Sequence, residues 1–177
     1  MAIKKIIFLF IIALLVVGCV ANGVYDKELK KVILGRVVVF ENDKEYSFIE
    51  VHGSGIKSFV KQPAFGNIFG ADIYGDGLVV GNAEKSEYKL NMIYGRYNEL
   101  IVDKKFPAIN VQIGLEEGIY YFGCIVLKYD GNKLIDIKIE NNLEEDLDDA
   151  KQYISGYKKL NIIDLTDKIK EQINNKN

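Results

Sequence analysis

Apolar and polar residues alternate with a period of two in several stretches of the chain, which is typical of β-strands with one face in solvent. The alternation is clearest at 87–94 and 134–140, where Tyr, Leu, Met and Ile alternate with Glu, Lys, Asn and Asp. Most apolar segments are short and are bounded by Gly, Asn, Asp or Pro, the residues that form turns. The pattern predicts nine strands, at 32–40, 46–51, 56–60, 77–80, 87–94, 99–102, 109–113, 119–129 and 134–140.

The segment 119–129 is apolar at neighbouring as well as alternate positions, so it is predicted to be a central strand buried on both faces. Asp130-Gly131-Asn132 separates it from 134–140, and this sequence predicts a hairpin because Gly and Asn accept a positive φ. Nine strands with no helix between them predict a mainly β fold. We expect an antiparallel β-sandwich or a partly closed barrel.

The pattern becomes helical near the end of the chain. Apolar residues recur there at intervals of four, three and four, which places them on one face of a helix that Asn142 caps and Gly156 ends. The acidic residues of this stretch resemble a calcium cluster at first sight, but we interpret them as the negative first turns of the helix. A second helix is predicted from Asp164. The apolar positions are Leu143, Leu147, Ala150 and Ile154, and the acidic ones are Glu144, Glu145, Asp146, Asp148 and Asp149.

The first nineteen residues have the features of an export signal. Lys4 and Lys5 precede twelve uninterrupted apolar residues at 6–17. Twelve helical residues reach roughly 18 Å, which is short of the roughly 30 Å hydrocarbon layer, so a signal-peptide core fits better than a membrane span.

The sequence Val16-Val17-Gly18-Cys19 that follows resembles the lipobox of bacterial lipoprotein precursors. The resemblance implies a diacylglyceryl group on the thiol of Cys19 and cleavage before it. Residues 1–18 would then be the signal peptide, 19–30 the lipidated N-terminus and tether, and 31–177 a single domain. An ordinary signal peptide or an uncleaved anchor, with an incidental cysteine, is the alternative.

Lipidation would hold the protein at a membrane, since each buried CH₂ contributes roughly 0.8 kcal/mol and two or three chains together bind almost permanently. Residues 20–29 span at most about 33 Å when extended, so the domain would stay close to the bilayer. Similarity to Gram-negative lipoproteins implies the outer membrane, because Val20, not Asp, follows the cysteine. A Gram-positive host would imply the plasma membrane.

Charge and composition argue against several classes of function. Lys and Arg total 23 residues against 25 for Asp and Glu, and only Arg36 and Arg96 are arginines, so no nucleic-acid-binding surface is predicted. With Cys19 lipidated, Cys124 is left without a disulfide partner and is interpreted as a buried, inert thiol. A single His with a single free Cys falls short of a zinc site, and neither a Walker motif nor a nucleophile elbow is present. No metal and no cofactor is therefore expected.

Two aromatic segments are candidates for binding. Phe65, Phe69 and Tyr74 lie in a glycine-rich stretch with no clear period, and Tyr94 and Tyr97 flank Arg96 in a second segment. Such rings are enriched at contact surfaces, although they can equally close the open end of a sandwich.

The sequence 118–123, GIYYFG, followed by an apolar strand, a hairpin and an acidic helix, also resembles uncharacterised small envelope lipoproteins with a β-sandwich fold. Together these features predict a non-enzymatic, lipid-anchored envelope protein that binds a protein, peptide or glycan. A structural subunit of an envelope complex is the alternative. A small hydrolase using His52 with Asp72 or Asp76 is a further one, although 52–55 is interpreted as a turn between strands.

Overall fold

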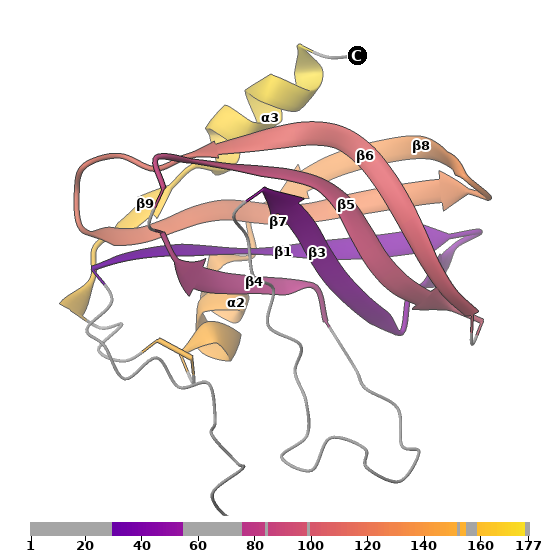
Figure 1. The fold of residues 1–177 in the computed structure, drawn as a ribbon, viewed down its shortest axis with the longest axis horizontal. Coiled ribbons are helices and arrows are strands. Elements are labelled where there is room, and N and C mark those ends of the chain that lie inside the picture. Colours follow the sequence, from indigo (N-terminus) through magenta and orange to yellow (C-terminus); the bar gives the residue numbers. More distant parts are fainter. Residues whose placement is uncertain are drawn as a thin grey trace, which may run out of the picture.

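The computed structural model describes residues 30–54, 76–83, 85–98, 100–151, 153–154 and 159–175 of the 177-residue chain. These residues form two β-sheets that face each other across a hydrophobic core, with two short helices near the C-terminal end (Figure 1). The elements are β1 (Lys31–Glu41), β2 (Lys44–Glu45), β3 (Phe48–Ser54), β4 (Leu78–Asn82), β5 (Glu87–Tyr97), β6 (Leu100–Gln112), β7 (Gly118–Asp130), β8 (Lys133–Glu140), α2 (Leu143–Ala150), β9 (Ile162–Asp164) and α3 (Thr166–Asn174).

The larger sheet is built around the adjacent strands β1 and β7, and the smaller sheet has the order β3-β5-β6. β4 pairs with the first half of β1, and β2 pairs with its end. On the side of β7 that faces away from β1, β9 pairs with the start of β7 and β8 pairs with the remainder of β7. Positive φ angles at Asn42, Asp43, Asn98 and Gly131 make the turns of the three hairpins β1–β2, β5–β6 and β7–β8.

The predicted mainly β architecture of two sheets with short C-terminal helices is confirmed, and the described sheets do not close into a barrel. The larger sheet is mixed and not antiparallel throughout, because β1 runs parallel to β7, and β7 parallel to β9. The parallel pairing agrees with the burial of the first part of both central strands on both faces, as is general for parallel strands. One face lies in the core between the sheets, and α2 covers part of the other.

The central position of β7 and the hairpin at Gly131 are confirmed. Two predicted strands, 99–102 and 109–113, are joined in the single strand β6, because Pro107 lies at an irregularity where the β5–β6 register shifts and not at a strand end. His52 was expected to begin a turn, but it lies within β3, where a register shift after His52 keeps Gly53 and Ser54 in the ladder. The predicted strand 56–60 lies outside the described residues, and the short strand β9 was not predicted.

Both C-terminal helices form, with ends that differ from those predicted. α2 ends at Ala150, Gly156 lies outside the described residues, and Asn142 makes no side-chain cap. Asn141 caps instead, its Oδ1 accepting a hydrogen bond of 3.2 Å from the N–H of Leu143. In α3, the Asp164 carboxylate accepts the N–H of Thr166 at 2.8 Å, so the acidic residue caps the helix from β9. None of the helices in the described part of the chain combines the length and hydropathy needed to cross a bilayer.

Polar side chains of α3 and β6 connect the smaller sheet to the rest of the fold. On the side of α3, the Gln172 amide bonds the backbone N–H and C=O of Asn110 at 3.0 and 2.8 Å, which covers the outer edge of β6 much as another strand would. At the hairpin end, Lys104 Nζ from β6 donates to the carbonyl of Gly131 at 2.5 Å and lies 3.4 Å from Glu41. Gln172 therefore joins α3 to the smaller sheet, and Lys104 joins the two sheets directly.

Candidate functional site

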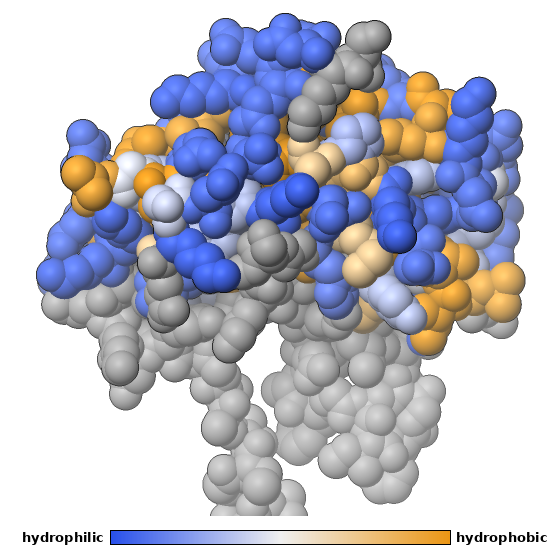
Figure 2. Space-filling model, turned by 45° about the horizontal axis from the view of Figure 1, so that its top comes forward, coloured by the Kyte–Doolittle hydropathy of each residue, from blue (hydrophilic) through white to orange (hydrophobic). Residues whose placement is uncertain are grey.

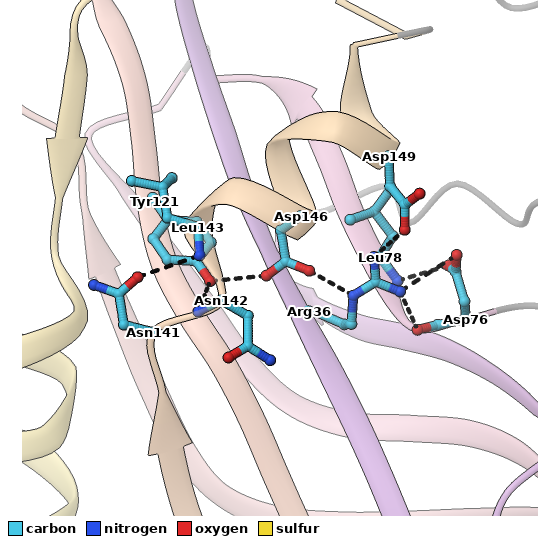
Figure 3. Close-up of polar contacts among 9 residues, drawn as sticks. All are labelled: Arg36, Asp76, Leu78, Tyr121, Asn141, Asn142, Leu143, Asp146 and Asp149. Carbon is cyan, nitrogen blue, oxygen red and sulfur yellow. Dashed lines mark hydrogen bonds and ion pairs between the residues drawn. The ribbon is translucent and has the colours of Figure 1, made fainter.

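Arg36 stands at the centre of the densest polar cluster in the described structure (Figure 3). It belongs to β1, where Leu34 and Val32, two and four residues earlier, point from the same face toward α2. The apolar contacts between this face and α2 thus end at the guanidinium of Arg36, a side chain that is only 13% exposed. Such a group requires compensating carboxylates, because an unpaired charge is costly in a site shielded from water.

Three carboxylates compensate Arg36. Its Nε donates to Asp146 Oδ1 at 2.5 Å, and Nη2 donates to Asp149 Oδ2 at 2.6 Å, both on α2. Nη1 lies 3.4 Å from Asp76, just before β4. Figure 3 shows the guanidinium between these carboxylates. Burial alone would lower the pKa of Arg36, but the bond to Asp146 and the neighbouring negative charges raise it, so the side chain stays charged.

Asp146 is the buried member of this cluster, with a side chain that is 0% exposed. Its second oxygen accepts a hydrogen bond of 2.8 Å from the hydroxyl of Tyr121 on β7, and that hydroxyl accepts the N–H of Asn142 at 3.0 Å. Burial, followed by the bond to Asp146, raises the pKa of Tyr121 and keeps its proton in place. The network therefore ties α2 to both central strands.

A surface pocket of about 560 Å³ opens beside Arg36. Its size falls in the range of small-molecule and side-chain binding sites. Its polar lining consists of Arg36, Glu45, Ser47, Asp76, Asn142 and Glu145, and its less polar lining consists of Val38, Tyr46, Ile49 and Cys124. The pocket combines an apolar wall with carboxylates that come from separate segments of the chain.

The charge balance of the pocket is negative. Glu45, Asp76 and Glu145 are acidic, whereas Arg36 is its one basic lining residue in the described structure, with its Nε and Nη2 already bonded to α2. A cationic group would therefore be stabilised at this place. An anion would meet repulsion from the carboxylates.

The predicted inert thiol of Cys124 forms part of the pocket wall. The side chain is free and 1% exposed, and burial raises its pKa to about 12. A thiolate would not form near neutral pH, so this cysteine offers the pocket a soft neutral surface and no nucleophile.

Of the predicted binding aromatics, the structure describes two, and they point to opposite sides of the smaller sheet. Tyr94 is on the outer face of β5 and is 43% exposed. Tyr97 packs against the core, with its ring 5.5 Å from that of Tyr46. Phe65, Phe69 and Tyr74 lie outside the described residues, as does Cys19.

The proposed hydrolytic residues are not brought together in the pocket. His52 lies on β3 with its ring 6.0 Å from that of Tyr94, and it does not line the pocket that contains Asp76. Asp72 lies outside the described residues. Within the described ranges, no group of three or more His, Cys, Asp and Glu side chains is arranged to hold a metal ion.

Sequence reasoning missed the Arg36–Asp146 pair, although the sequence contains a signal for it. Arg36 interrupts an otherwise apolar strand, and Asp146 lies three residues after Leu143 and four before Ala150, on the buried face of α2. A basic and an acidic residue that each occupy an apolar face are expected to meet, since neither is stable there alone.

Comparison of the chain with protein-family models, with curated proteins and with solved structures gives no match. The function is therefore inferred from the residues and their geometry.

Proposed function

We propose that the protein is a lipid-anchored lipoprotein of the bacterial cell envelope that acts by non-catalytic binding, and that the pocket beside Arg36 receives a basic side chain of a protein or peptide. The observation that carries the binding proposal is the excess of carboxylates in the pocket, around a guanidinium that is already paired. The lipobox-like sequence ending at Cys19 supports the anchoring proposal.

A lysine or arginine side chain fits this pocket better than a neutral glycan does. Val38, Tyr46 and Ile49 provide apolar surface for the aliphatic stem, and Glu45 and Glu145 provide negative charge for its end. Both glutamates are exposed, so each contributes modestly, and attraction to a polybasic partner would weaken at high salt.

The binding proposal is tested by pull-down from solubilised membranes with the native lipidated protein. Glu45→Gln combined with Glu145→Gln is expected to lower partner recovery at least several-fold and to reduce its dependence on salt. Glu144→Gln is the matched control, because Glu144 is on the same helix and exposed but does not line the pocket. Equal recovery with all three proteins would contradict the proposal.

The anchoring proposal has its own test. Mass spectrometry of the native product is expected to show a diacylglyceryl group at Cys19 and no residues 1–18. Cys19→Ser is expected to release the protein from the membrane fraction, because no acyl chain would remain to bury. An intact leader with an unmodified thiol would refute the anchoring.

A structural subunit of an envelope complex is the second candidate, and exposed apolar residues favour it. Leu100 and Ile101 at the β5–β6 hairpin are 68% and 65% exposed, close to Tyr94. Figure 2 shows a hydrophobic area at the lower right, on the side where this hairpin lies in Figure 1. Recovery of one stoichiometric partner that is lost with Ile101→Asp and kept with the pocket variants would favour this role.

A further inference from the structure

The chain enters the fold beside the loop that joins β6 to β7. Lys31 Nζ donates to the carbonyl of Gly114 at 2.7 Å, and the N–H of Gly118 donates to the carbonyl of Lys30 at 2.8 Å. Lys30 also pairs with Glu117 at 3.2 Å. The point where any N-terminal tether leaves the domain is thus fixed against this loop.

Leu115 projects from the loop and is 96% exposed, the largest value among the exposed large hydrophobic residues of the described structure. Ile162 of β9 is 44% exposed at the same end, where the N–H of Ile119 bonds the carbonyl of Asn161. Isolated exposed apolar residues are common on protein surfaces. Leu115 differs because it lies next to the start of the tether, so the membrane that holds a lipid anchor would face it.

We infer that this end of the sandwich rests on the bilayer that holds the lipid anchor, with Leu115 inserted at the level of the headgroups. The inference rests on the proposed lipidation of Cys19. Residues 20–29 span at most about 33 Å, so the membrane surface would always be within reach of the loop. A single leucine binds a bilayer weakly from solution, but a tether makes the contact intramolecular and raises its effective concentration.

The surroundings of Leu115 set the depth of the contact. Glu116 and Glu117 follow it and keep the loop out of the hydrocarbon, whereas Lys30 and Lys31 lie beside it, where lipid phosphates would be. In this orientation the β5–β6 and β7–β8 turns, at the opposite end in Figure 1, point away from the membrane. The domain would then stand on the bilayer in a defined orientation and would not swing freely.

The test uses the native full-length protein, reconstituted with phosphatidylethanolamine–phosphatidylglycerol vesicles, with an environment-sensitive fluorophore on Leu115→Cys. Leu100→Cys is the matched control, an exposed leucine at the opposite end of the domain. The thiol of Cys124 is buried and would not take the label. We expect a blue shift and at least several-fold stronger quenching by lipid-borne quenchers for the label at position 115.

Vesicle flotation of the same samples separates the two proposals. Protein that floats with the vesicles but gives the same spectrum and quenching at both positions would refute the membrane contact and leave the anchoring intact. Protein that does not float would refute the anchoring, and the membrane contact with it.

Discussion

Asp146→Ala is expected to be among the most destabilising substitutions on α2. The side chain is fully buried and binds two partners, the guanidinium of Arg36 at 2.5 Å and the hydroxyl of Tyr121 at 2.8 Å. Removing it breaks both bonds and leaves the hydroxyl without its acceptor carboxylate. It also removes the side chain that connects α2 to β1 and β7 at once.

The magnitude follows from these contacts. A hydrogen bond to a charged group contributes about 1.5–3 kcal/mol, which gives an upper value near 6 kcal/mol for the two bonds. Asp76 and Asp149 still neutralise Arg36 in the variant, so the guanidinium is not left unpaired. We therefore expect a loss of about 3–4 kcal/mol, similar to that for other broken buried ion pairs. This is a large part of the 5–15 kcal/mol typical of a domain.

The assay is urea unfolding followed by circular dichroism, since the chain has no Trp. Asp148→Ala is the control: it lies on the same helix and removes the same charge, but its side chain is 70% exposed and pairs only at the surface with Lys151. We expect it to cost less than about 0.5 kcal/mol. A loss below about 1 kcal/mol for Asp146→Ala, or equal losses for both variants, would refute the role given to the buried network.

Three further predictions concern backbone, pH and reactivity. Gly77→Ala is expected to cost more than about 2 kcal/mol in thermal unfolding, and Gly131→Ala about 1 kcal/mol. Both glycines have a positive φ, but only at Gly77 would the new Cβ meet a backbone oxygen, at 1.9 Å. Equal losses for the two variants would contradict this. Burial alone would raise the pKa of Asp164, but hydrogen bonds from Thr166 lower it below the ordinary 3.8. The native protein should therefore be more stable than Asp164→Ala by about 1 kcal/mol above pH 3.8, and this difference in stability should shrink as the pH falls through the pKa of Asp164 in the folded state. Urea titrations at pH 7 and pH 2 measure this, and a constant difference would count against it. The thiol of Cys124, with a pKa of about 12, should react with a thiol reagent at least about 100-fold more slowly in the folded lipidated protein than in urea, and comparable rates would show that it is accessible.

The sequence predicted most strands because the alternation of side chains reflects local burial. It failed where burial depended on distant elements. The apolar character of 119–129 indicated that β7 is covered on both faces, but nothing in the local pattern indicated that its neighbour would be β1, in parallel, or that α2 would pack against this pair. Pro107 suggested a break between strands, whereas the tertiary structure accommodates it at a register shift within β6.

The candidate site was less predictable than the fold. The pocket gathers residues from β1, from β2 to the start of β3, from the segment just before β4, from β7 and from the start of α2, and no local pattern relates them. The acidic stretch was interpreted as the negative first turns of a helix, which agrees with the position of Asp146 in the first turn of α2 but does not account for its burial against Arg36. Helical spacing places Asp146 on the same face as Leu143 and Ala150. A search for polar residues on the apolar face of the predicted helix would therefore have identified Asp146 as a buried charge.

The parallel pairing of β1 with β7 also has a consequence for folding. Val32 pairs with Ile119 and Glu41 with Tyr129, so β1 meets its most extensive partner only after the five strands β2 to β6 of the described structure have been synthesised. Such a high contact order predicts slow folding, limited by closure of one long loop. In a chain that crosses a membrane from its N-terminus, β1 would arrive early and wait without this neighbour. During that delay the apolar positions of β1 would be prone to aggregation until β7 emerges.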